Sequence, residues 1–139
     1  ADATQTMTYP SMLGMEEPEI RIYPPASVIA EKFQAMVTLG VANGRMKDYF
    51  DLWAIPKALD IAPDDLDAAI RATFERRGTT IPAERPPGLS SAMTTDDAKQ
   101  AQWRAYAVSL DLQDLAFEEV IEAAWALIGP SCERLSIKP

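Results

Sequence analysis

The sequence contains no histidine at all, and Cys132 is its single cysteine. The absence of histidine excludes Ser-His-Asp and Cys-His nucleophiles, and metal sites with imidazole ligands, from this chain. One cysteine cannot form an internal disulfide bond, which fits a reducing cytoplasm. Any acid–base chemistry must therefore come from carboxylate, lysine or tyrosine side chains.

Long hydrophobic runs are also absent. No stretch approaches the roughly 18 consecutive apolar residues of a membrane-spanning helix, and the sequence as printed shows no signal peptide. We therefore expect a cytoplasmic protein with no membrane partner. Basic residues are fewer than acidic ones, 13 against 21, and the formal net charge is −8. This balance opposes non-specific binding to nucleic acid but permits a local basic patch.

The remaining composition is typical of one globular domain. Hydrophobic residues make up 47% of the 139 residues, and a chain of this length buries a substantial core without metal ions or disulfide bonds. Hydrophobic residues recur at helical spacing, which predicts a mainly α (α+β) fold, a bundle of about five helices. We predict helices over residues 27–39, 45–55, 63–78, 95–109 and 114–128. Pro56 is expected to stop or kink the second of these, and Gly129-Pro130 to close the last.

The predicted helices divide the single domain, residues 1–139, into four segments. These are an N-terminal loop and strand element (1–25), a helical segment (26–78), a proline-rich loop (79–94) and the C-terminal helices (95–139). Within the first segment, Ile20 and Ile22 alternate with polar neighbours between two prolines, which predicts a short half-buried strand over 18–24. The fold is therefore expected to carry a small β element at its N-terminal end.

Residues 28–53, VIAEKFQAMVTLGVANGRMKDYFDLW, raise the question of function because charged residues lie beside apolar stripes. On the first helix Glu31 falls opposite the apolar face and is expected to be solvated, whereas Lys32 lies at the border of that face. Two interpretations of Lys32 stay open. Its stem covers apolar surface while its ammonium reaches water, or it is a cation directed into a cleft and available to a phosphate or a carboxylate.

The second helix carries four charged residues within seven positions. Arg45 and Asp48 are three apart, and Lys47 and Asp51 are four apart, so salt bridges on one helix are the simple interpretation of both pairs. Arg45 is closer to the apolar face than a solvated residue should be, and Asp51 is predicted on the far side with Lys47.

A tight turn at Asn43-Gly44 joins the two helices, which are therefore expected to be antiparallel neighbours. Charges that flank such a turn can converge at one end of a helix hairpin. The functional alternative is that the Asp48 carboxylate and the Arg45 guanidinium are held near Lys32 at one solvent-reachable rim. The enzymatic interpretation depends on this convergence.

The same segment resembles the C-terminal part of the nucleotidyl transferase AbiEii/AbiGii toxin family, which belongs to bacterial toxin–antitoxin and abortive-infection systems. The shared elements are a Tyr-Pro entry, an Ala-Glu-Lys core and an Arg-x-Lys-Asp-x-x-Asp-Leu motif. The matching residues are Tyr23, Pro24, Ala30, Glu31, Lys32, Arg45, Lys47, Asp48, Asp51 and Leu52. The later stretches AIRATFERRGTTIPAE and AKQAQWRAY are also similar to members of this family, so the resemblance covers most of the chain.

The resemblance implies a transferase that moves a nucleotide from an NTP, with Mg²⁺, to an acceptor for which RNA is the candidate. It implies that Lys32 contacts phosphate or neutralises charge in the transition state, and that Asp48 orients Lys32, a hydroxyl or a metal-bound water. Arg45, Asp51 and Lys47 would bind the nucleotide or support the catalytic pair. A cognate antitoxin is the implied protein partner.

One part of the family pattern is missing. Members are expected to carry a Gly-Ser motif and an Asp-x-Asp pair in their N-terminal half, but no Gly-Ser occurs here, and Asp65-Leu66-Asp67 lies in a predicted helix. Together with a start at Ala1, this predicts a C-terminal fragment that holds no metal and is inactive without the N-terminal nucleotidyltransferase region of the same protein. Two alternatives stay open: a non-catalytic helical module that binds an antitoxin or another protein, and a plain domain whose charges only cap and pair.

Overall fold

The computed structural model describes residues 24–136, and every regular element within them is helical. The α-helices are α1 (Pro25–Leu39), α2 (Met46–Ala58), α3 (Pro63–Arg76), α4 (Ser91–Thr94), α5 (Asp97–Ser109) and α6 (Phe117–Ser136), and two short 3₁₀ helices are η1 (Gly40–Ala42) and η2 (Pro87–Leu89). The predicted mainly helical fold is confirmed. The strand predicted over 18–24 gains no support, because residues 18–23 lie outside the described residues and Pro24 immediately precedes α1.

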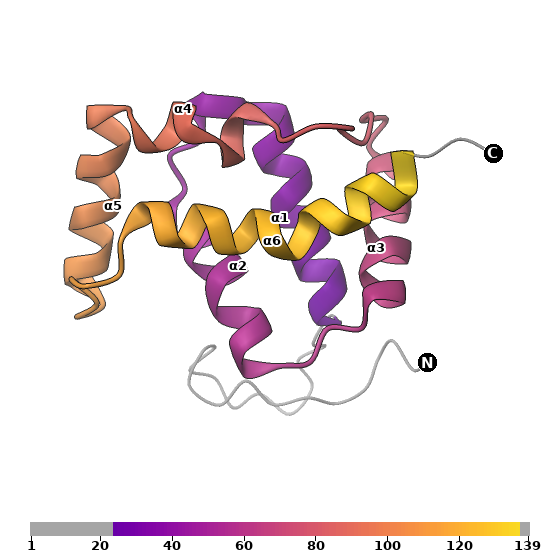
Figure 1. The fold of residues 1–139 in the computed structure, drawn as a ribbon, viewed down its shortest axis with the longest axis horizontal. Helices are drawn as coiled ribbons and strands as arrows, with labels where there is room; N and C mark the ends of the chain where they lie inside the picture. The colour runs from indigo at the N-terminus through magenta and orange to yellow at the C-terminus, as the bar shows by residue number, and fades with distance from the viewer. Residues whose placement is uncertain (1–23, 137–139) are drawn as a thin grey trace.

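The longest helix, α6, organises the others. Figure 1 shows α6 running across α1, α2 and α3. The helices α2 and α3 pack directly against α6, α1 packs along α3, and α5 lies beside α2 at one end. The chain ascends through α1, turns at η1 and descends through α2 (Figure 1), so these two helices run in opposite directions, as predicted. The middle of α1 therefore lies beside the first turns of α2.

A buried aromatic core joins these helices. Phe33 of α1 packs on Phe74 of α3 with ring centroids 5.4 Å apart. Phe117 of α6 contacts Tyr49 of α2 and Trp103 of α5, with centroids 5.5 and 5.4 Å apart. None of these five side chains is more than 2% exposed. Burial of this apolar area provides the main stabilisation and holds α1, α2 and α3 in fixed positions.

The end of α2 differs from prediction, because Pro56 does not stop the helix. The helix continues to Ala58, and the Leu59 amide still donates to the Ile55 carbonyl at 2.9 Å. A proline removes one backbone donor but leaves the amides after it free to bond. Its place in the last turn makes that loss small.

The end of α6 also differs, because Gly129-Pro130 does not close it. The last turns are held by tertiary contacts: Cys132 is 1% exposed in the core, and the Arg134 guanidinium donates to both oxygens of Asp67 on α3 at 2.7 and 2.9 Å. These contacts outweigh the low helix propensity of glycine and proline.

Other helix starts shift by a few residues. Pro25 begins α1 two residues before Ser27, since proline suits the first helical turn. The Asp96 carboxylate accepts from the Lys99 amide at 3.0 Å, which starts α5 at Asp97 rather than at residue 95. The predicted loop 79–94 contains η2 and α4, and α6 begins at Phe117 rather than at residue 114. Within the described range, none of the helices combines the length and the hydrophobicity that crossing a membrane requires.

Candidate functional site

Lys32 of α1 and two aspartates of α2 form an ion cluster between the two helices. The Lys32 Nζ atom lies 3.0 Å from Asp48 Oδ1 and 3.1 Å from Asp51 Oδ2. The two carboxylates are only 4% and 5% exposed, and the Lys32 side chain is 19% exposed. Of the two interpretations of Lys32, the structure favours the second, because the ammonium is directed at carboxylates of a neighbouring helix rather than into bulk water.

Each aspartate receives a second cation from its own part of the chain. Arg45 Nε lies 3.2 Å from Asp48 Oδ2, and Lys47 Nζ lies 2.8 Å from Asp51 Oδ2, so both predicted pairs are present. Both basic side chains are 68% exposed and form the outer layer of the cluster. The prediction that Arg45 lies towards the apolar face is wrong, because Arg45 precedes the first turn of α2 and does not follow its helical wheel.

The prediction that Asp51 lies on the far side of its helix is also wrong. The helix α2 contacts α1, α5 and α6, so more than one of its faces is buried. A helical wheel that assumes one buried face therefore places Asp51 on the wrong side. The Asp51 side chain points to α1 and is buried beside Lys32. The structure therefore brings Lys32, Asp48, Arg45, Asp51 and Lys47 into one cluster, while their catalytic roles stay predictions.

The cluster has three basic and two acidic side chains. Removing the partner of a buried charge typically costs roughly 3–5 kcal/mol, because the remaining charge is left uncompensated. Here the second cation on each aspartate means that neither carboxylate depends on Lys32 alone. The arrangement can therefore tolerate a change in the contacts of Lys32 better than an isolated ion pair can.

Burial lowers the pKa of the Lys32 ammonium, but its hydrogen bonds to Asp48 and Asp51 and their negative charges together outweigh burial, so the pKa lies above its ordinary value of 10.5. Lys32 is therefore positively charged at neutral pH and acts as a cation rather than as a base. An ammonium has three N–H donors. With two directed at the aspartates, the third remains for a group outside the cluster.

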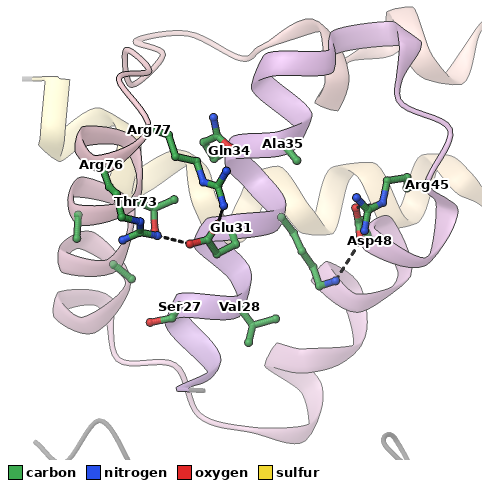
Figure 2. A pocket seen from close by; sticks show the side chains of 13 residues that line it. Ser27, Val28, Glu31, Gln34, Ala35, Arg45, Asp48, Thr73, Arg76 and Arg77 are labelled. Atoms are coloured by element: carbon green, nitrogen blue, oxygen red, sulfur yellow. Dashed lines mark hydrogen bonds and ion pairs between the residues drawn. The ribbon is translucent and has the colours of Figure 1, made fainter. Parts of the chain in front are cut away.

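A pocket of about 830 Å³ opens over α1 beside this cluster (Figure 2). Its wall comes from α1, from the start of α2 and from the C-terminal half of α3. The lining residues are Ser27, Val28, Glu31, Lys32, Gln34, Ala35, Arg45, Asp48, Ala69, Ala72, Thr73, Arg76 and Arg77. Its volume is in the range of small-molecule binding sites. Figure 2 shows Glu31 pointing to Arg76 and Arg77, while Asp48, the partner of Lys32, lies on the other side of α1.

Glu31 is not simply solvated, contrary to prediction. Arg76 donates a hydrogen bond to Glu31 Oε2, and the Arg77 guanidinium lies 2.9 Å from Glu31 Oε1. A second link joins α1 to the segment that follows α3, because the Gln34 amide donates to the Thr79 hydroxyl at 2.9 Å. Sequence reasoning missed the arginines as site residues. Arg76 and Arg77 belong to the stretch AIRATFERRGTTIPAE, which resembles the family. Arg76 lies 45 residues from Glu31 in the sequence, however, and the sequence alone does not show that the two are close in space.

Comparison with known proteins identifies a family. Residues 2–123 match the sequence model of a family described as nucleotidyl transferase AbiEii toxin, type IV TA system. The chain belongs to this AbiEii family. The match includes the Lys32 cluster and the Glu31–Arg76–Arg77 group. No curated protein and no solved structure matches the chain. As toxins of toxin–antitoxin systems, AbiEii proteins are expected to have an antitoxin as partner.

The described residues of this AbiEii chain do not by themselves fit a Mg²⁺ ion. Asp48 and Asp51 each face two basic groups, at distances between 2.8 and 3.2 Å. Nowhere in residues 24–136 do three or more His, Cys, Asp or Glu side chains gather as metal ligands. Asp67, the second member of the Asp-x-Asp pair, is bonded to Arg134. We therefore assign no step of the reaction to a metal held by these residues alone.

Proposed function

We propose that this chain supplies the Lys32–Asp48 part of the active site of a nucleotidyltransferase toxin. The toxin transfers a nucleotide from an NTP to an acceptor, and RNA is the candidate acceptor. The Lys32 ammonium carries this proposal, because two buried carboxylates hold it at 3.0 and 3.1 Å beside a pocket. Family membership supports the class of reaction, and this geometry supports the roles of the residues.

Lys32 is suited to stabilise the transition state. Nucleotidyl transfer spreads negative charge over the phosphate oxygens, and a cation already fixed in a partly buried site stabilises that charge without having to reorganise. Asp48 and Asp51 act as positioning residues that use two donors of the ammonium and leave the third for a phosphate oxygen. Arg45 adds a second cation at the pocket wall, and Lys47 supports Asp51 from the outside.

We place the metal-binding carboxylates of the reaction in an N-terminal nucleotidyltransferase region of the same protein. Two observations support this: no Gly-Ser pair occurs in the sequence, and Asp65-Leu66-Asp67 lies on helix α3 rather than on a strand. In this proposal the chain is the C-terminal portion of the toxin, and it is inactive without the N-terminal region. The whole protein acts in the bacterial cytoplasm and is restrained by a cognate antitoxin.

The test measures nucleotide transfer by the protein expressed from its complete open reading frame, incubated with RNA and one α-³²P-labelled NTP at a time. Lys32→Met keeps the stem and removes the ammonium, so we expect transfer to fall by about 10²–10³-fold. Asp48→Asn should reduce transfer less, because Asp51 still holds Lys32. Lys57→Met is the matched control, since Lys57 is an exposed lysine of α2 whose Nζ atom lies over the Trp53 ring, 4.8 Å from its centroid.

Labelling of RNA by Lys32→Met at the wild-type rate would contradict the catalytic role. Growth inhibition measured on the same variants separates the two function classes. If Lys32→Met still inhibits growth but binds the antitoxin differently, the chain is the non-catalytic interaction module instead.

A further inference from the structure

The α3 side of the pocket holds two guanidinium groups on one carboxylate. Arg76 ends α3 and Arg77 follows it, and both reach Glu31 of α1. Within residues 24–136 each guanidinium makes a single hydrogen bond, to Glu31, although each has five N–H donors. The side chains of Arg76, Arg77 and Glu31 are 58%, 52% and 38% exposed. The pair therefore keeps an excess positive charge and unused donors at an open pocket.

The charge of the pocket is opposite to the charge of the chain. Four basic side chains line it, Lys32, Arg45, Arg76 and Arg77, against the two acidic side chains of Glu31 and Asp48. The chain as a whole has a net charge of −8. Basic side chains that gather in one concavity of an acidic protein repel one another, and such a concavity attracts anions. Guanidinium groups bind phosphate with paired hydrogen bonds.

A purely structural role leaves one arginine unexplained. The helices α1 and α3 are already joined by the buried contact of Phe33 with Phe74, and the Gln34 amide donates to Thr79 just after α3. An exposed ion pair adds little to stability, typically about 0–1 kcal/mol. A link between the helices needs at most one arginine on Glu31, and the second guanidinium adds mainly charge.

We propose that Arg76 and Arg77 bind a phosphodiester group of a single-stranded RNA, the acceptor of the transferred nucleotide, and that Glu31 occupies the two arginines when RNA is absent. This role rests on the proposed function of the Lys32 side of the pocket. Arg76 and Arg77 lie on the opposite side of α1 from Asp48 (Figure 2), so a strand held by the arginines can cross α1 towards Lys32. A single strand is flexible and can follow a pocket of about 830 Å³ over α1.

The test measures binding of a fluorescein-labelled single-stranded RNA 12-mer by anisotropy, with protein from the complete open reading frame, over a range of salt concentrations. Arg76→Ala/Arg77→Ala should weaken binding about tenfold or more at low salt. The slope of log K against log salt should become shallower by about 0.7, because one phosphate of a single strand is no longer neutralised. Arg71→Ala/Arg104→Ala is the control, since it removes the same charge from two exposed arginines outside the pocket lining.

Glu31→Gln provides the decisive comparison, because the two roles predict opposite outcomes. If Glu31 competes with RNA for the arginines, Glu31→Gln binds RNA several-fold more tightly. The gain disappears when Arg76→Ala/Arg77→Ala is added. If Glu31 and the arginines only join two helices, Glu31→Gln lowers the melting temperature and does not tighten binding, which overturns the inference.

Three further outcomes overturn it as well: no binding of RNA by the wild type, equal weakening by the control pair, or an acidic peptide that displaces RNA while mononucleotides and unlabelled RNA do not. If the Arg76→Ala/Arg77→Ala protein fails to fold, Arg76→Lys/Arg77→Lys replaces it in the test, because this variant keeps both positive charges. The lysine variant should bind RNA more weakly than the wild type and show the same slope of log K against log salt. Arg76→Ala/Arg77→Ala should weaken RNA binding by the same factor in the Lys32→Met background as in the wild type, so failure of the proposed transfer reaction is seen separately from failure of this binding site.

Discussion

Glu31 and Lys32 are consecutive residues of α1, yet different helices neutralise them. Glu31 is bound by Arg76 and Arg77 at the end of α3, whereas Lys32 lies 3.0 Å from Asp48 of α2. Consecutive side chains of a helix point about 100° apart, and α1 packs against both α2 and α3. Glu31 and Lys32 therefore lie on two different charged sides of a single pocket. Substitutions on the Lys32 side and on the Glu31 side can test the two sides independently.

Lys32→Met should lower the free energy of unfolding by about 1–3 kcal/mol. This is less than the roughly 3–5 kcal/mol expected when a buried charge loses its only partner, because Arg45 and Lys47 stay on the two aspartates. Urea denaturation followed by tryptophan fluorescence measures the change. Lys57→Met is the control and should change stability by about 1 kcal/mol or less, since Lys57 is exposed and its cation–π contact with Trp53 is worth little at an exposed site. A Lys32→Met protein as stable as the wild type would show that the cluster does not need its central cation.

The stabilisation from Lys32 should depend on pH only in the alkaline range. Its pKa in the folded protein lies above 10.5, so the stabilisation is complete below about pH 10 and is lost as the pH rises through the folded pKa. Urea denaturation of wild type and Lys32→Met should therefore give a constant difference in unfolding free energy from about pH 7 to 10, and a shrinking difference above it. A difference that widens above pH 10.5 would contradict the raised pKa.

The difference is a better readout than the wild-type curve alone. Burial also raises the pKa of the Tyr49 and Tyr106 hydroxyls, with the charge of Asp51 adding to the effect on Tyr106. Unfolded tyrosines ionise before these folded ones do, so both proteins lose stability at alkaline pH for a reason unrelated to Lys32. Subtracting the two curves removes most of this shared loss.

Gly88→Ala should destabilise the fold, because η2 approaches α1 too closely for a side chain. The Tyr49 hydroxyl donates to the Gly88 carbonyl at 2.8 Å, and a Cβ atom on Gly88 would lie 2.7 Å from the Met36 carbonyl oxygen. The backbone must shift, at a cost of about 1–3 kcal/mol. Thermal unfolding followed by circular dichroism measures it.

Gly44→Ala is the matched control for that experiment. A Cβ atom there would meet only the flexible Gln102 side chain, at 3.5 Å. Such a surface change typically stays within about 0.5 kcal/mol. Equal shifts in melting temperature for the two variants would show that the close approach of Gly88 to α1 is not the cause of the destabilisation by Gly88→Ala.

Local patterns explain which parts of the fold could be predicted. The salt bridges of Arg45 with Asp48 and of Lys47 with Asp51 follow from helical spacing. The approach of Lys32 to Asp48 follows from a short turn between antiparallel helices. The ends of α2 and α6 could not be predicted, because Pro56 and Gly129-Pro130 are local stop signals that did not end the helices. Pro56 lies in the last turn of α2, where the lost backbone donor costs little, and tertiary contacts hold the last turns of α6.

The sequence by itself determined the helical class, the family and the set of charged residues on α1 and α2, because hydrophobic periodicity and motif spacing are local properties of the chain. Only the tertiary structure decided that Asp51 turns inward to Lys32 and that Glu31 meets Arg76 and Arg77. The physical reason is that a helical wheel fixes directions only relative to one buried face. The helix α2 is covered on several sides, and the partners of Glu31 lie 45 and 46 residues away along the chain.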